Sequence, residues 1–343
     1  MLSYVLKRIG LALVTCVIII TMSFLLIKLL PYEKPLGLDE KRYAVYQKEI
    51  KLGYIFSSPL ELSGYRYVDE TTINGTTTYF YEVPVFDQYI NWVGNIVLRW
   101  DWGISNQISP GNTAMSILKR DLPTTIKINI WSVLISVPLG ILLGIWAALK
   151  KNTAVDHTIS TSIMVFSSIP SFVMITVFML LLCYQTGWLP TQWPSDGSAA
   201  DVQFKGYIIP VICLSYGSIA GYARAVRAEL CEVMSSDYLL LARTKGLTKN
   251  QAITRHALRN AMVPIVPGIL AEVIGLLSGS MILEQLYGIP GVGKLYVTAL
   301  NERDFNVLFT DMALFTAIGL LAAVVLDLSY GFIDPRIRMG AKK

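Results

Sequence analysis

One run of residues has the spacing of a nucleotide-binding loop: Gly288-Ile289-Pro290-Gly291-Val292-Gly293-Lys294. A P-loop holds phosphates with backbone N–H groups and a Lys, and its next residue is a Ser or Thr that binds Mg²⁺. Here the next residue is Leu295, and no strand pattern precedes the run. We therefore expect a Gly- and Pro-rich turn between helices at this place, and no nucleotide site.

Other residue types that carry out catalysis are sparse. His157 and His256 are the only His, they lie far apart, and no His, Asp or Glu group has metal-ligand spacing. Ser167-Ser168 have no base at a readable distance. The sequence predicts no catalytic residue, no metal site and no cofactor in this chain. An intramembrane hydrolase and a membrane sensor are distant alternatives, and a sensor would need an output domain that the short loops do not supply.

Three polar positions inside apolar runs are candidates for a pathway or for a contact with another subunit. Glu272 is an ionisable residue within an apolar run, which is costly in a bilayer and marks a functional site by default. The alternative is a protonated or hydrogen-bonded packing residue. Ser132 and Ser136 recur with Gly140 and Gly144 at every fourth position, a period that lets two helices pack closely. A polar face on a substrate path is the other interpretation of these serines.

The composition places these residues in a membrane. The 343 residues are 53% hydrophobic and 15% charged, whereas soluble domains carry about 25% charged residues. Six runs are long and apolar enough to cross a bilayer: 9–27, 128–149, 158–184, 206–223, 262–283 and 312–333. Lys and Arg concentrate in the short loops on one side, which predicts that both termini are cytoplasmic. The net charge of +5 reflects this topology, and we expect no nucleic-acid partner.

The predicted topology divides the chain into four parts. Residues 1–30 form an N-terminal transmembrane anchor, 31–125 an extracytoplasmic insertion, 126–335 a five-helix core, and 336–343 a cytoplasmic tail. Within the insertion, 65–73 and 76–83 flank Asn74-Gly75, a strong hairpin signal, and 86–100 has the period of an amphipathic helix. The four Cys show no disulfide or metal spacing.

The cytoplasmic loop 224–261 contains clear helix boundaries. Ser236 is a candidate cap for a helix over 237–245, and Gly246 stands where a left-handed stop is favoured. Thr248 and Gln251 have the spacing of a capping box for a second helix. The first helix has about two turns and is rich in Leu, and helices this short are marginal alone. We therefore expect it to dock on the rest of the chain or on a partner protein.

This loop resembles the cytoplasmic signature of ABC importer permeases, in particular the dipeptide/oligopeptide (and nickel) branch and its first, B-type, subunit. The likeness rests on Asp237-Tyr238, Ala242-Arg243-Thr244-Lys245-Gly246-Leu247, Arg255-His256-Ala257-Leu258-Arg259-Asn260-Ala261 and Pro264. Leu240, His256 and Arg259 depart from the general signature. Further matches, in the family's order, are at 121–125, 290–293, 303–304 and 334–338. Nothing is carried over to 31–110, which is longer than the resemblance leads us to expect.

The resemblance implies an all-α type I importer permease fold in a bacterial inner membrane. The residue patterns add six transmembrane helices and a small extracytoplasmic α+β insertion to this expectation. The partners implied by the resemblance would be a homologous second permease, two ABC ATPase subunits, an extracytoplasmic peptide-binding protein and the lipid bilayer. The short helix would couple to an ATPase through Asp237, Tyr238, Leu241, Ala242, Arg243, Lys245, Gly246 and Leu247. The expected function is ATP-driven peptide uptake, with nickel or metal chelates or glutathione as alternative cargo.

Overall fold

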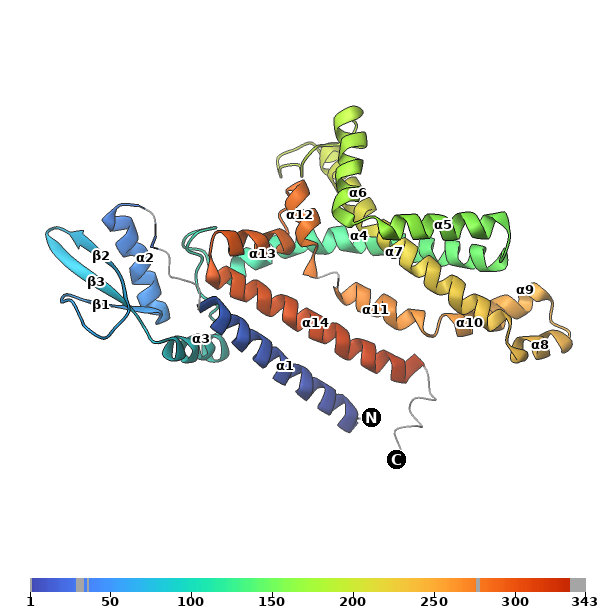
Figure 1. Ribbon diagram of the computed structural model, residues 1–343, viewed down its shortest axis with the longest axis horizontal. Helices are drawn as coiled ribbons and strands as arrows, with labels where there is room; N and C mark the ends of the chain where they lie inside the picture. Colours follow the sequence, from blue (N-terminus) through green and yellow to red (C-terminus); the bar gives the residue numbers. More distant parts are fainter. Residues whose placement is uncertain (1, 29–33, 36, 276–277, 334–343) are drawn as a thin grey trace. The chain divides into compact units, whose positions relative to one another are not determined.

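The computed structural model describes residues 2–28, 34, 35, 37–275 and 278–333. The expected cytoplasmic tail 336–343 and the motif at 334–338 lie outside these residues. The described chain is mostly helical, with one three-stranded sheet (Figure 1). Its residues form two compact units, one from 2–12, 121–275, 278–294 and 317–333, and the other from 13–28, 34, 35, 37–120 and 295–316. We call them the core unit and the insertion unit.

Four described helices are long and apolar enough to cross a membrane. They are α1 (Leu2–Lys28), α4 (Ala114–Leu149), α7 (Ala200–Met234) and α14 (Phe305–Ile333). Two bent helix pairs, 154–168 with 171–185 and 249–261 with 265–275, raise the number to as many as six if each pair is one span. The first pair covers the expected run 158–184, whereas the second overlaps the expected run 262–283 only at 265–275. Helix α4 begins at Ala114, within the segment 31–125 that was assigned to the insertion, and its first turns contain the charged residues Lys119, Arg120 and Asp121.

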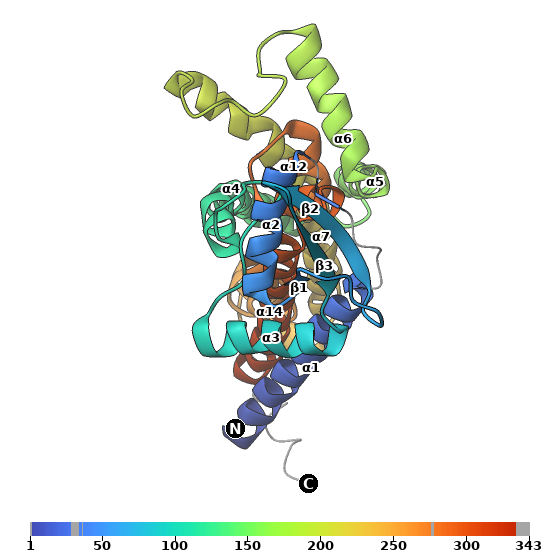
Figure 2. The same ribbon diagram turned by 90° about the vertical axis from the view of Figure 1, so that its left-hand side faces the viewer.

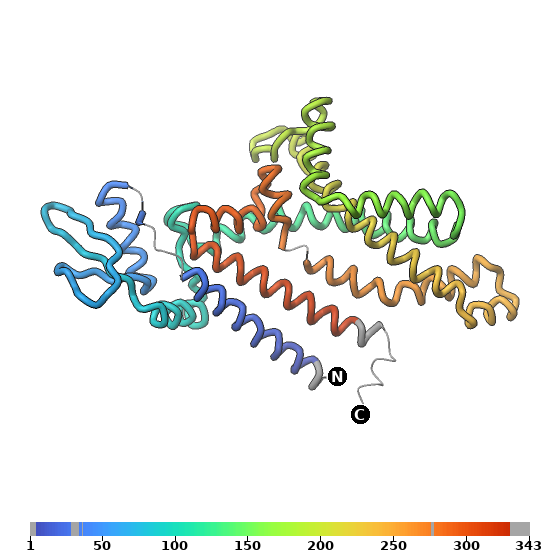
Figure 3. The backbone as a smooth tube through the Cα atoms, in the orientation of Figure 1, coloured from blue at the N-terminus to red at the C-terminus, as the bar shows by residue number. Residues whose placement is uncertain are grey.

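The third and fifth expected spans are not continuous helices, which corrects the sequence prediction. Helix α5 (Ala154–Ser168) meets α6 (Ser171–Phe178) and the π-helix η1 (Met179–Gln185) at a 99° bend, visible in the tube trace of Figure 3. Ile169 is extended there because it precedes Pro170, and a residue before Pro avoids the helical conformation. The fifth span, 262–283, is replaced by α11 (Ile265–Gly275) and α12 (Met281–Tyr287).

The insertion unit contains the predicted hairpin. Strands β2 (Tyr67–Ile73) and β3 (Thr76–Glu82) pair around Asn74 and Gly75, which both have positive φ, as a type I′ turn requires. Strand β1 (Ile55–Ser58) adds to β3, so the antiparallel order is β1-β3-β2.

Two helices accompany the sheet. Helix α2 (Asp39–Leu52), which the sequence patterns did not predict, lies against the sheet (Figure 2) and packs Tyr46 against Phe80, with ring centres 4.4 Å apart. Helix α3 (Val85–Arg99) confirms the predicted amphipathic helix. Helix α13 (Val292–Asn301) follows α12 along the chain and precedes α14.

Candidate coupling site

The loop between α7 and α11 is the candidate functional site. Helix α7 extends to Met234, so 224–234, predicted as loop, is the last three turns of that helix. Helix α8 (Asp237–Thr244) begins after Ser236 as predicted, but the Ser236 hydroxyl donates to the carbonyl oxygen of Val233, at 2.6 Å. Ser236 therefore closes the end of α7 and does not cap α8 with its side chain.

Helix α8 docks on its own chain through one buried residue and one hydrogen bond. Leu239 is 4% exposed and lies in an apolar cluster with Leu230 of α7 and Ile253 and Ala257 of the following helix. A second contact is polar, since the side-chain amide of Asn260 donates to the Tyr238 hydroxyl at 2.9 Å. The predicted docking on the rest of the chain is thus confirmed for one face of the helix.

The remaining large apolar side chains of α8 are exposed. Tyr238 is 41% exposed, Leu240 62% and Leu241 56%. Helix α8 lies with α9 at the far end of α7 (Figure 1). A cavity of about 210 Å³, whose lining includes Leu240 and Arg243, opens between the two helices. Helix α8 thus combines one buried Leu with two exposed Leu within eight residues.

Backbone hydrogen bonds explain how the loop closes after α8. The N–H of Gly246 donates to Arg243 and the N–H of Leu247 to Ala242, which is the Schellman arrangement. Gly246 has φ of +97°, yet a Cβ there would meet nothing within 4 Å. Glycine is therefore required by the backbone conformation and not by space, as predicted.

The second helix starts with the predicted capping box. The Thr248 hydroxyl accepts from the backbone N–H of Gln251, and the Gln251 side chain accepts from that of Thr248. The helix runs through α9 (Lys249–Ala252), the π-helix η2 (Ile253–Ala257) and α10 (Leu258–Ala261). The exposed Asp, Glu, Lys and Arg side chains between 237 and 261 are all cationic except Asp237: Arg243, Lys245, Lys249, Arg255 and Arg259. The surface around α8 therefore combines exposed Leu with positive charge.

An ion pair missed by the sequence analysis joins α5 to α7. Arg227 binds Asp156 with two parallel hydrogen bonds, of 2.5 and 2.8 Å, and Asp156 is 1% exposed. The backbone N–H of Asn152 also donates to Asp156, at 2.9 Å. Bidentate geometry makes such pairs strong and specific in orientation. The pair fixes α5 against the half of α7 that leads to α8.

The sequence-predicted Glu272 lies on α11 and is bound by residues of α7. Its carboxylate accepts from Ser218 at 2.6 Å and from the Tyr222 hydroxyl. Glu272 is half-buried and lines a cavity of about 300 Å³ together with Gly221, Gly268 and Pro264. The geometry is that of a hydrogen-bonded residue at the edge of a cavity, and a pathway role for Glu272 stays a prediction.

Ser132 and Ser136 are residues of α4, and Ser132 contacts Ser215 of α7. Ser132 is 3% exposed and its hydroxyl is 3.2 Å from that of Ser215, while Ser136 is fully buried. A Cβ on Gly140 would lie 2.6 Å from the Tyr222 Cβ, and one on Gly144 would lie 2.7 Å from the carbonyl oxygen of Ala223. This is the close packing that a four-residue period of small residues predicts. A pathway role for the two serines stays a prediction.

The Gly-rich run 288–294 encloses a carboxylate of its own chain. Glu284, 2% exposed, accepts from the Thr125 hydroxyl and the Lys294 backbone N–H, each at 3.0 Å. A Cβ on Gly291 would lie 2.4 Å from this carboxylate. The resemblance to a P-loop thus has a physical origin, because both need glycines where backbone approaches an anion. Here the anion is Glu284.

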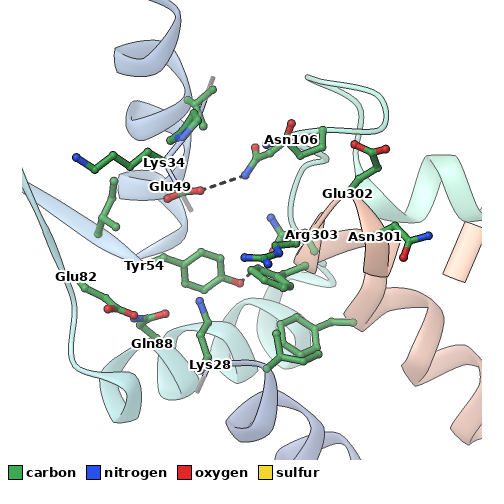
Figure 4. A pocket seen from close by; sticks show the side chains of 18 residues that line it. Lys28, Lys34, Glu49, Tyr54, Glu82, Gln88, Asn106, Asn301, Glu302 and Arg303 are labelled. Atoms are coloured by element: carbon green, nitrogen blue, oxygen red, sulfur yellow. Dashed lines mark hydrogen bonds between the residues drawn. The ribbon is translucent and has the colours of Figure 1, made fainter. Parts of the chain in front are cut away.

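The insertion unit contains a polar cavity of about 230 Å³ (Figure 4). The ends of Lys28, Tyr54 and Arg303 point toward one another, and the Lys28 amine lies 4.2 Å from the centre of the Tyr54 ring. Glu49 receives a hydrogen bond of 3.4 Å from Asn106 on another wall. Next to Arg303, the buried carboxylate of Asp304 accepts from Ser105 and three backbone N–H groups. The matched motif at 303–304 therefore has a structural role in holding the loop 105–108.

The site that the sequence predicted is mostly accessible. Leu247 and Ala242 are half-buried, and the other six named residues are exposed: Asp237, Tyr238, Leu241, Arg243, Lys245 and Gly246. Asp156 and Glu284 were missed because a carboxylate's partner is not readable from spacing when it lies on another helix.

Three comparisons place the chain among transport proteins. Residues 140–339 match the family model of the binding-protein-dependent transport system inner membrane component. The chain is 28% identical to the dipeptide transport system permease protein DppB of Bacillus subtilis over 100% of both chains. It is 30% identical to the oligopeptide transport system permease protein OppB of Salmonella typhimurium, over 98% of this chain and 100% of that one.

The match to DppB spans the whole chain and therefore includes 31–110, the segment to which the resemblance carried nothing over. Among solved structures, the MetNI methionine ABC transporter in an inward-facing conformation is similar, with a TM-score of 0.52 and 18% identity. The likeness covers 64% of this chain and 97% of that one, and it supports the helical fold alone.

Proposed function

Because the chain belongs to the family of binding-protein-dependent transport system inner membrane components, we propose that it is the permease subunit of an ABC importer for short peptides, coupled to separate ATPases through α8. The peptide substrate is supported by the names of the full-length relatives DppB and OppB. A second, homologous permease would complete the pathway, and an extracytoplasmic binding protein would deliver the peptide.

The observation that carries the coupling role is the division of α8 into two faces. Leu239 fixes the helix to its own chain, while Leu240 and Leu241 remain 62% and 56% exposed. Burying a Leu side chain in a partner contributes about 1.5–3 kcal/mol, so these two residues represent a substantial unused binding energy. The exposed cations beside them, Arg243 and Lys245, favour a partner surface with negative charge.

Two features of the chain make α8 suitable for transmitting a movement. Its polar and apolar contacts reach α7 and the 249–261 helix, so a displacement of α8 acts on both. The Asp156–Arg227 pair continues this contact to α5. In the proposed mechanism, ATP-driven movement of the ATPases displaces α8, and the attached helices reorient the pathway between its outward-facing and inward-facing states.

The experiment uses the assembled transporter in vesicles with two changes in the loop. Leu241→Asp places a charge in the proposed contact, where an unpaired buried ion costs about 3–5 kcal/mol. Gly246→Val strains the left-handed stop of the helix. Both variants should insert normally but lose peptide uptake, with ATPases that dissociate or hydrolyse ATP without stimulation by substrate.

Matched controls exist in the insertion unit. Leu60 is 71% exposed, and Gly64 has φ of +93° with open space around its Cβ position. Leu60→Asp and Gly64→Val repeat the chemistry of the two changes away from the loop and should leave ATPase binding intact. Normal uptake by both loop variants with ATPases bound would remove the coupling role from α8. If the loop variants lose uptake of metal chelates but keep uptake of peptides, the assignment of peptides as the substrate is contradicted.

A further inference from the structure

An apolar groove of about 150 Å³ lies between α1 and α3 in the insertion unit. Helix α3 packs against the last turns of α1, where Phe24 stacks on Trp92 with ring centres 5.0 Å apart. The Thr21 and Tyr89 hydroxyls are 2.7 Å apart and fix the same contact. Beside it the groove is lined largely by aliphatic and aromatic side chains, among them Val17, Ile20, Val93, Ile96, Val97 and Trp102.

The position of the groove along α1 places it at the depth of lipid tails. By its length and composition, the candidate membrane span of α1 runs from Val5 to Lys28. At 1.5 Å per residue, Val17 and Thr21 lie about 10–16 Å along the helix from its Lys28 end. A hydrocarbon core about 30 Å thick therefore includes the α1 side of the groove. The neighbouring surface of α1 is apolar and exposed as well, with Val14 at 57%, Val17 at 61% and Ile18 at 56%.

The outer face of α3 is also apolar and uncovered by the described chain. Phe86 is 72% exposed, Ile90 52%, Val97 73%, Leu98 83% and Trp100 68%. A helix with such a face and a polar opposite side commonly lies in the membrane interface. Aromatic residues such as Trp100 are enriched at the same depth.

Two hydrogen-bond donors at the groove have no acceptor among the described residues. The indole N–H groups of Trp92 and Trp102 are buried and unbonded, and both residues line the groove. A buried indole N–H normally has a partner. A purely apolar occupant would leave both unsatisfied, whereas a phospholipid offers ester carbonyl oxygens next to its acyl chains.

We propose that this groove and the adjoining face of α3 bind a phospholipid of the leaflet at the Lys28 end of α1. One acyl chain lies between Val17 and Val97, and an ester carbonyl oxygen accepts from the indole N–H of Trp102. The bound lipid joins α3 to α1 at the membrane surface. This inference requires that α1 spans the bilayer and is independent of the transported substrate.

The first test measures lipid retained by the purified, assembled transporter, using native mass spectrometry. Trp102→Phe keeps an aromatic ring and removes the indole donor, and it should lower the fraction of transporter with bound phospholipid about fivefold, the effect of one hydrogen bond. Trp188→Phe is the matched control, because Trp188 is 55% exposed and lies in the core unit. Equal retention by the two variants, or none by the parent, would overturn the proposal.

The second test reads the environment of α3 in vesicles. A nitroxide on Val97→Cys, in a background without the four native Cys, should collide with oxygen dissolved in the bilayer and little with a water-soluble nickel chelate. A nitroxide on Glu61→Cys, in an exposed loop, should show the reverse. Chelate access at 97 would place α3 in water, and inaccessibility to both reagents would show that a protein partner covers it. Either result would refute the lipid assignment.

Discussion

Truncation of Leu239 should release α8 from its own chain. Leu239 is 4% exposed and is the buried anchor of an eight-residue helix. Leu239→Ala leaves a cavity in the cluster with Leu230 and Ile253, and such changes cost about 2–5 kcal/mol. Since helices this short are marginal alone, the loss should unfold α8 locally while the transmembrane helices stay intact.

Leu241→Ala provides the opposite case on the same helix. Leu241 is 56% exposed, so truncation removes little buried area within the chain and should cost about 1 kcal/mol or less. Its effect should appear in the assembled transporter, as weaker ATPase binding. The two leucines thus separate intramolecular docking from partner binding.

Amide hydrogen exchange of the isolated chain in nanodiscs measures the difference. Amides of 237–244 should exchange at least tenfold faster in Leu239→Ala than in the parent, because the opening free energy falls by more than about 1.4 kcal/mol. In Leu241→Ala they should exchange as in the parent. Equal acceleration in both variants, or none in Leu239→Ala, would refute the assignment of the two faces.

Further predictions concern packing, pH and topology. Gly144→Val should lower the free energy of unfolding of the chain in detergent by about 1–3 kcal/mol, because the new Cβ would lie 2.7 Å from a backbone oxygen of α7. Gly221→Ala should not lower it, because the space around Gly221 is open. Burial raises the pKa of Asp69, but hydrogen bonds from the neighbouring Tyr and Lys and the charge of the nearby Arg hold it below its usual value. Because the folded-state pKa is lowered, the stabilisation is present above the unfolded pKa and is lost as pH falls through the folded one. In Asp69→Asn, the free energy of unfolding of the insertion should therefore depend less steeply on acid pH than in the parent. Tryptophan fluorescence during acid unfolding measures this difference. Cysteines introduced at 40–110 should react with impermeant reagents on intact cells and those at 236–250 should not; the reverse would overturn the proposed orientation.

Local sequence determined the elements whose cause is local. Six apolar runs specified the membrane class, because a bilayer requires about 20 apolar residues for each crossing. Asn74-Gly75 specified the hairpin, Gly246 the stop of α8 and Thr248 the start of the next helix. In each case a backbone conformation or a neighbouring hydrogen bond imposes the residue type, and both act within a few residues.

The tertiary structure decided every feature that depends on a partner distant in sequence. Only the fold shows that Leu239 is buried while Leu241 is exposed. From the sequence, both are simply apolar residues of one short helix. The same holds for Asp156, whose partner Arg227 is 71 residues away, and for Glu284, which binds Thr125 at a separation of 159. A charge in an apolar segment must be compensated. The sequence shows the charged residue but does not show which group compensates it. Packing of the helices supplies the group.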